Sequence, residues 1–263
     1  MGRLIREASS PESITSAVFF FGSIITLRDL WHLIGHADGS FYTGPVLVWA
    51  TIVAAGLCFV AGVLRSQTAL RIAAAVAFCA TQYFLHIDPY KADHTTLLSV
   101  YTLLVLAFIP NSKLSVGLEA ARILLLSTYT ISGVMKIFAI AYQCLHHSSA
   151  CSAYGASALF ASSELGSGRR GLVQSFFVEH NIVALEAYIL VIAFQIAIPL
   201  LYFLGKGRAL VGIELITFHI VVYLVMQILF LENIILIFLL FVLPVLCKRI
   251  SQIIDMQTRI APT

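Results

Sequence analysis

Charged residues are scarce in this chain. Asp, Glu, Lys and Arg make up 11% of its 263 residues, whereas a soluble globular protein carries about 25%. Hydrophobic residues reach 60%, and the mean hydropathy is +0.95. This composition excludes an ordinary soluble domain and predicts an all-α, polytopic helical bundle in a lipid bilayer. The net charge of +3 does not point to nucleic acid, and we expect no nucleic-acid partner.

The sequence also lacks a signal-peptide cleavage site, a convincing repeat, a heptad pattern and low-complexity tracts. The apolar run Ile14–Ile25 is followed at once by Arg28 and Asp29, so we interpret this first segment as a retained helix. The lack of an inverted repeat ranks a transporter last among the candidate functions.

Apolar runs of about 17–25 residues are long enough to span a bilayer. We predict a single domain over 1–263 with about eight transmembrane helices and short linkers. The exception among the linkers is a loop at about 144–182, which can hold a short amphipathic helix. The predicted spans are 13–34, 45–64, 69–87, 94–110, 119–143, 183–204, 209–230 and 232–247.

Lys and Arg in the loops predict the orientation, because they gather on the cytoplasmic side. With the N-terminus inside, eleven of them fall inside and three outside, so both termini are predicted to be cytoplasmic and the long loop extracytoplasmic. The predicted inner residues are Arg3, Arg6, Arg65, Arg71, Lys113, Arg122, Lys206, Arg208, Lys248, Arg249 and Arg259, and the outer ones are Lys91, Arg169 and Arg170.

Two of the five cysteines fall in the predicted outer loop. Cys144 and Cys151 can form a disulfide there, since disulfides persist in extracytoplasmic compartments. A metal site that adds His146 and His147 is the alternative, but the spacing matches no standard zinc pattern, and we expect no metal.

Lys136 is the most informative residue, because it lies inside an apolar segment. A charged side chain at membrane depth costs about 2.5–3.5 kcal/mol on insertion scales. Residues three and four apart share a helix face, so Tyr129, Ser132, Gly133 and Lys136 form one stripe of small and polar groups. Small residues permit close helix approach, and this stripe is predicted to face the bundle. Snorkelling of Lys136 to the interface is the structural alternative.

Most other polar residues are predicted to lie near the outer leaflet, with His219 near mid-depth, and each has a structural alternative. His94 opens the fourth span from outside, where it contributes to the site or is a helix cap or a hydrated side chain. His219, with Tyr223 and Gln227 on the same face, binds a ligand or a backbone carbonyl. Arg28 binds a ligand or forms an ion pair with Asp29. The carboxylates are expected to be structural: Glu186 suits the positive end of a helix dipole, and Glu179 and Glu232 are expected to be interfacial and solvated.

Four segments occur in the order and helix spacing of a known membrane family. They are Phe19-Phe-Phe-Gly-Ser-Ile-Ile-Thr-Leu-Arg-Asp29, Asp88-Pro-Tyr-Lys-Ala-Asp-His94-Thr-Thr-Leu-Leu, Tyr129-Thr-Ile-Ser-Gly133-Val-Met-Lys136-Ile and Phe218-His219. Through nearly its whole length the chain resembles the membrane part of the vitamin K-dependent γ-carboxylases, a family that includes the bacterial horizontally transferred transmembrane (HTTM) proteins. The third segment, which resembles the family's Tyr-x-x-Ala-Gly-x-x-Lys signature, is the most specific match.

The resemblance implies roles for these residues. A lysine at the position of Lys136 deprotonates reduced vitamin K in the carboxylases, and oxygen then converts the quinol anion to a strong base that removes a glutamate γ-proton before carbon dioxide adds. By this resemblance His94 and His219 orient the quinol or stabilise its oxygens, and Tyr129, Gly133, Tyr223 and Arg28 line the cofactor site. Reduced vitamin K or menaquinone is the implied cofactor.

The chain departs from the family at three points. Asp93 stands where Asn is usual, Met135 replaces the first member of a Lys-Lys pair, and the sequence ends about 16 residues after the last predicted helix, so we expect no soluble substrate domain. The leading hypothesis is a multi-pass enzyme of the bacterial plasma (inner) membrane that modifies a peptide or small substrate at its extracytoplasmic face. The alternative is a non-catalytic partner of a secreted peptide, in which Lys136 pairs with Asp29 or Glu186.

Overall fold

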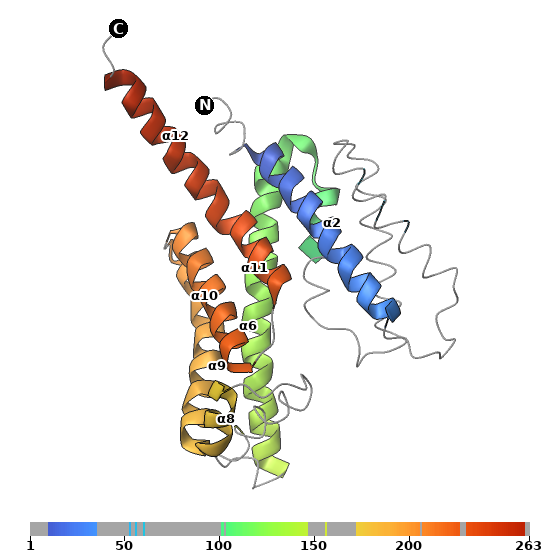
Figure 1. Cartoon of the computed structure of the whole chain (residues 1–263), viewed down its shortest axis with the longest axis vertical. Coiled ribbons are helices and arrows are strands. Elements are labelled where there is room, and N and C mark those ends of the chain that lie inside the picture. The colour runs from blue at the N-terminus through green and yellow to red at the C-terminus, as the bar shows by residue number, and fades with distance from the viewer. Residues whose placement is uncertain are drawn as a thin grey trace. The chain divides into compact units, whose positions relative to one another are not determined.

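The structure is a computed structural model that describes residues 10–35, 53, 56, 60, 101–102, 104–146, 156, 172–205, 207–226 and 230–260. Every regular element in these ranges is helical, and none is a strand, as the composition predicts. In chain order they are α2 (Pro11–Gly35), the 3-10 turn η1 (Asn111–Lys113), α6 (Leu114–His146), α8 (Leu172–Glu179), α9 (Asn181–Phe203), α10 (Arg208–Met226), α11 (Leu231–Ile237), the π-helical turn η3 (Phe238–Val242) and α12 (Leu243–Ile260) (Figure 1).

Four helices of the described chain are long and apolar enough to cross a membrane. The candidate spans are Leu114–Tyr142, Asn181–Phe203, Arg208–Val225 and Leu231–Ile254. In each of these helices, between 22% and 33% of the most apolar stretch of 18 residues is buried inside the protein. Because the remaining apolar surface is stable only away from water, the protein belongs in a lipid bilayer.

The four candidate spans overlap the predicted spans 119–143, 183–204, 209–230 and 232–247. α2 overlaps the predicted span 13–34 as a helix but is not among the candidate membrane spans. The predicted spans 45–64 and 69–87 lie outside the described residues except for positions 53, 56 and 60, and the span 94–110 is described only in its second half. The count of eight and the cytoplasmic termini therefore stay predictions. The short helix expected in the loop 144–182 is confirmed as α8.

The chain divides into two compact units, one formed by Met1–Leu124 with Ile235–Thr263 and the other by Leu125–Ile234. In the first unit, the amide of Ser13 donates to Ser10 Oγ over 3.2 Å. This side-chain cap, with Pro11 at the first helical position, begins α2. α2 then packs against the π-turn, and its buried Ile14 and Val18 contribute to the core of this unit.

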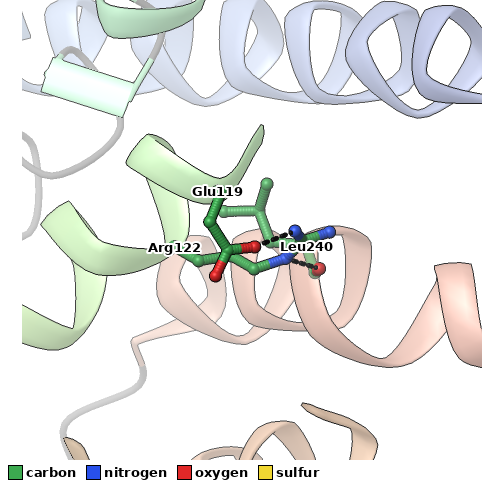
Figure 2. A network of polar contacts seen from close by, with 3 residues as sticks. All are labelled: Glu119, Arg122 and Leu240. Atoms are coloured by element: carbon green, nitrogen blue, oxygen red, sulfur yellow. Dashed lines mark hydrogen bonds and ion pairs between the residues drawn. The ribbon is translucent and has the colours of Figure 1, made fainter. Parts of the chain in front are cut away.

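Arg122 is bound to the π-turn in the first unit. Pro244 has no N–H to donate to the carbonyl of Leu240, four residues earlier, and a proline ring clashes with that carbonyl in a regular α-helix. The chain widens here into a π-turn, in which the Leu243 amide donates to Phe238 O. Arg122 Nε donates to Leu240 O over 2.7 Å, and its Nη1 donates to Glu119 Oε2 over 2.9 Å (Figure 2). The freed carbonyl thus regains a donor from α6.

Two charged residues are buried where the sequence did not indicate it. Arg122, which the charge count assigns to the cytoplasmic side, lies inside α6 with 4% of its surface exposed, and Leu240 O and Glu119 bind its guanidinium. Its side of the membrane stays a prediction. Glu232 was predicted to be interfacial and solvated, but it is also 4% exposed. It lies in the first turn of α11, where the positive end of the helix dipole favours a carboxylate.

In the second unit, α9 lies beside α10 and beside the short α8 (Figure 1). α9 ends where the amides of Leu204 and Gly205 donate back to Leu200 O and Tyr202 O. Gly205 has a φ of 76°, a left-handed conformation that glycine adopts without strain and that commonly terminates helices. This turn sends the chain into α10 and so determines which faces of the two helices meet.

Candidate functional site

The predicted polar stripe of α6 does face the interior of the second unit. Tyr129 and Gly133 are buried, and Ser132 and Lys136 are half-buried. The residues on the opposite side of the helix are exposed and apolar, as expected for a surface in contact with lipid. They are Ile131, Val134, Met135, Ile137 and Phe138.

Gly133 lets α9 approach α6 closely. A Cβ atom at this position would lie 3.0 Å from Ile196 Cγ1 and 3.3 Å from Gln195 Cβ. Both distances are shorter than ordinary van der Waals contact, so a Cβ at this position would require the side chains of Ile196 and Gln195 to shift. The glycine therefore brings Gln195 of α9 next to the turn of α6 that carries Lys136.

Lys136 binds two neutral oxygens in the described chain. Its Nζ donates to Ser132 Oγ over 2.7 Å and to Gln195 Oε1 over 3.0 Å. The predicted alternative was an ion pair with Asp29 or Glu186. The side chain of Asp29 lies outside the described residues, and Glu186 is exposed, with no contact to Lys136 among the described atoms.

Gln195 is the site residue that sequence reasoning missed. Pro199, inside α9, has no N–H for the carbonyl of Gln195, so the helix lacks a backbone hydrogen bond where it meets Lys136. A buried glutamine four residues before a proline, in a span with few other polar groups, was a signal available in the sequence.

His219 and Tyr129 form a second buried polar contact in the same unit. Tyr129 Oη is hydrogen-bonded to His219 Nε2, and the two residues are 5% and 3% exposed. The other ring nitrogen, His219 Nδ1, has no hydrogen-bond partner among the described residues. A buried unpaired nitrogen is costly, and such a group is available to a ligand.

Aromatic rings surround this pair. The Phe218 and Phe194 rings are stacked, with centroids 5.0 Å apart and an interplanar angle of 14°. The Phe230 ring lies 5.3 Å from the His219 ring. Apolar rings lower the local dielectric and exclude water, which strengthens the remaining polar interactions.

The other predicted site residues are not joined to these groups. Tyr223 lies one turn after His219 on α10 but is 36% exposed. Arg28 lies on α2 and Cys144 on α6, but their side chains, like all of His94 and Cys151, lie outside the described residues. The predicted disulfide is therefore not observed. Within the described ranges no group of three His, Cys, Asp or Glu side chains could hold a metal ion.

Comparisons with known proteins name no relative. No protein-family model matches the chain, and no curated protein or solved structure is significantly similar to it.

Proposed function

We propose that this protein is a membrane enzyme in which Lys136 is the general base toward a reduced isoprenoid quinone. It would modify a peptide or small substrate at the extracytoplasmic face of the plasma membrane. The observation that carries the proposal is the environment of the lysine amine, which lies in a candidate span and donates to two neutral oxygens. The resemblance to the γ-carboxylase and HTTM family supplies the class of cofactor.

The hydrogen bonds of Lys136 suit a neutral amine. A neutral amine has two N–H donors and one lone pair, whereas an ammonium ion has three donors and none. Ser132 Oγ and Gln195 Oε1 accept two N–H bonds, and the lone pair is left to take a proton. Removal from water disfavours a charged amine, and buried lysines serve as catalytic bases for this reason.

Three groups of this unit have chemistry that suits a hydroquinone, which has two hydroxyls on a flat ring. Lys136 provides a proton acceptor, His219 Nδ1 a buried group without a partner among the described residues, and the Phe194–Phe218 stack apolar rings. When bound, a hydroquinone would supply a weakly acidic O–H and two electrons for oxygen. Lys136 Nζ would accept the proton as that O–H bond breaks. The ammonium formed would be held by Ser132 and Gln195.

The test is oxygen-dependent oxidation of reduced menaquinone or vitamin K by the purified protein in nanodiscs. We expect turnover by the native chain and none by Lys136→Met or Lys136→Arg. The arginine variant keeps the positive charge and N–H donors, but it cannot act as a neutral base, because arginine stays protonated in proteins. Lys113→Met is the matched control, since Lys113 is exposed in η1, and it should retain full activity.

Two outcomes would contradict the proposal. Full activity of Lys136→Arg would make the lysine a structural cation. Absence of turnover in a folded native protein, together with tight binding of a peptide, would favour the non-catalytic maturation partner. If turnover is found, a glutamate-containing peptide with labelled carbon dioxide is the first substrate to test, because the resemblance implies carboxylation.

A further inference from the structure

α12 has an exposed apolar face. Leu246, Ile250, Ile253 and Met256 recur at intervals of three and four residues, which places them along one side of the helix. They are between 43% and 56% exposed. Among the described elements, α12 packs chiefly against the π-turn at its own beginning, so these elements leave the face largely uncovered.

The opposite side of the same segment is polar, with more cations than carboxylates. By helical spacing Lys248, Gln252, Asp255 and Arg259 share that side, and Arg249 falls at its border with the apolar face. Residues 248–260 thus contain three cations and one carboxylate. Lys248 and Arg249 are exposed and have no ion-pair partner among the described residues. A helix with a basic face and an apolar face is typical of segments that lie in a membrane interface.

The length of the last candidate span puts Lys248–Ile260 at the depth of the lipid headgroups. Leu231–Ile254 has 24 residues, about 36 Å at 1.5 Å per residue, whereas the hydrocarbon core is about 30 Å thick. A helix that enters the core at Leu231 therefore leaves it near Ile250. Its basic and exposed apolar residues then meet the headgroups and the adjoining ends of the acyl chains.

We propose that Lys248–Ile260 docks on anionic lipid headgroups at the membrane surface where the last span emerges. Ile253 and Met256 would enter the boundary of the acyl chains, and Lys248 and Arg249 would contact headgroup phosphates. The opposite charge of basic helix and anionic lipid favours this occupant over a second copy of the chain. A second copy would bring the same cations together. By helical spacing Gln257 also falls among the apolar positions, where a pair of packed helices requires apolar residues.

The test is hydrogen–deuterium exchange on the full chain in two sets of nanodiscs. One contains only phosphatidylcholine, and the other contains phosphatidylcholine with phosphatidylglycerol. We expect slower exchange of the backbone amides of Lys248–Ile260 with the anionic lipid. Each removed cation should lower the docking equilibrium about fivefold. The double variant Lys248→Gln/Arg249→Gln should therefore lose most of the lipid-dependent protection, and added salt should do the same.

The matched control is Lys113→Gln, which removes an exposed cation far along the chain from α12; it should leave the lipid-dependent protection of Lys248–Ile260 unchanged. Equal exchange of this segment in both lipid compositions would overturn the proposal. Protection that is independent of lipid charge but rises with the number of chains per disc would also overturn it and identify a second copy as the occupant. The outcome does not depend on whether Lys136 is a catalytic base.

Discussion

The hydrogen bond between Tyr129 and His219 should make a measurable contribution to stability. Tyr129→Phe keeps the ring and its edge contact with Phe218, whose centroid is 6.3 Å away, but removes the hydroxyl that bonds His219 Nε2. Because His219 Nδ1 also lacks a partner among the described residues, the imidazole would then have none there. The variant therefore tests the value of one buried polar contact.

The magnitude depends on which of two effects is larger. Leaving a buried polar group unpaired costs about 1–3 kcal/mol in soluble proteins. Side-chain hydrogen bonds in membrane proteins are worth about 0.6 kcal/mol on average and about 1.7 kcal/mol at most, because the unfolded chain in the membrane also finds partners. Both residues are at most 5% exposed, and the aromatic rings beside them leave little access for water. We therefore expect Tyr129→Phe to lower the free energy of unfolding by about 1–1.5 kcal/mol.

A double-mutant cycle separates the energy of the Tyr129–His219 contact from the other effects of removing either side chain. His219→Phe should also destabilise, because it leaves the Tyr129 hydroxyl unpaired. In Tyr129→Phe/His219→Phe no polar group is left unpaired, so the double variant should lose clearly less than the sum of the single variants. The assay is reversible unfolding in mixed micelles, followed by helical circular dichroism as the denaturing detergent is increased.

Tyr223→Phe is the matched control, because Tyr223 lies on the same helix but is 36% exposed. Its change should stay within about 0.5 kcal/mol, as for most surface substitutions. A Tyr129→Phe effect no larger than that of the control, or strict additivity in the cycle, would refute the reasoning. The unfolded state would then compensate fully for the lost hydrogen bond.

Two further predictions concern helix packing and use the same unfolding assay. Gly133→Ala should destabilise by about 1–2 kcal/mol, because the overpacking cost against Ile196 at 3.0 Å outweighs the gain in helix propensity. Gly56→Ala, where the new Cβ meets nothing within 4 Å, should be neutral or stabilising, and equal effects of the two would count against close α6–α9 packing. Arg122→Met should cost about 1–3 kcal/mol by leaving the Leu240 carbonyl unpaired, with Arg122→Lys intermediate; a neutral Arg122→Met would contradict the role assigned to this bond.

The fold class was predictable because apolar runs and scarce charge require helices in a bilayer. The inward face of α6 was also predictable, since Tyr129, Ser132, Gly133 and Lys136 recur at helical spacing. In both cases the information is local, lying within one helix. The same reasoning located the last four predicted spans, although the final helix continues to Ile260, well beyond the predicted end at 247.

The partners across helices were not predictable from the same patterns. The burial of Arg122 was not predictable, because periodicity does not show that a carbonyl more than one hundred residues away needs a donor. Gln195 was overlooked for the same reason, since its role depends on where Gly133 lets α9 approach. The two prolines carried part of the missing information, because each removes the donor for a carbonyl four residues earlier.

The π-turn at Phe238–Val242 also changes the phase of the last helix. A π-turn accommodates one residue more than an α-turn, and one residue corresponds to a rotation of about 100° around the helix axis. Without the π-turn, the basic and apolar faces of α12 would be rotated relative to the buried pair Leu236 and Ile237. A one-residue deletion within the turn would therefore remove the extra residue that sets this phase. It would rotate the basic face of α12 by more than a quarter of a revolution relative to Leu236 and Ile237.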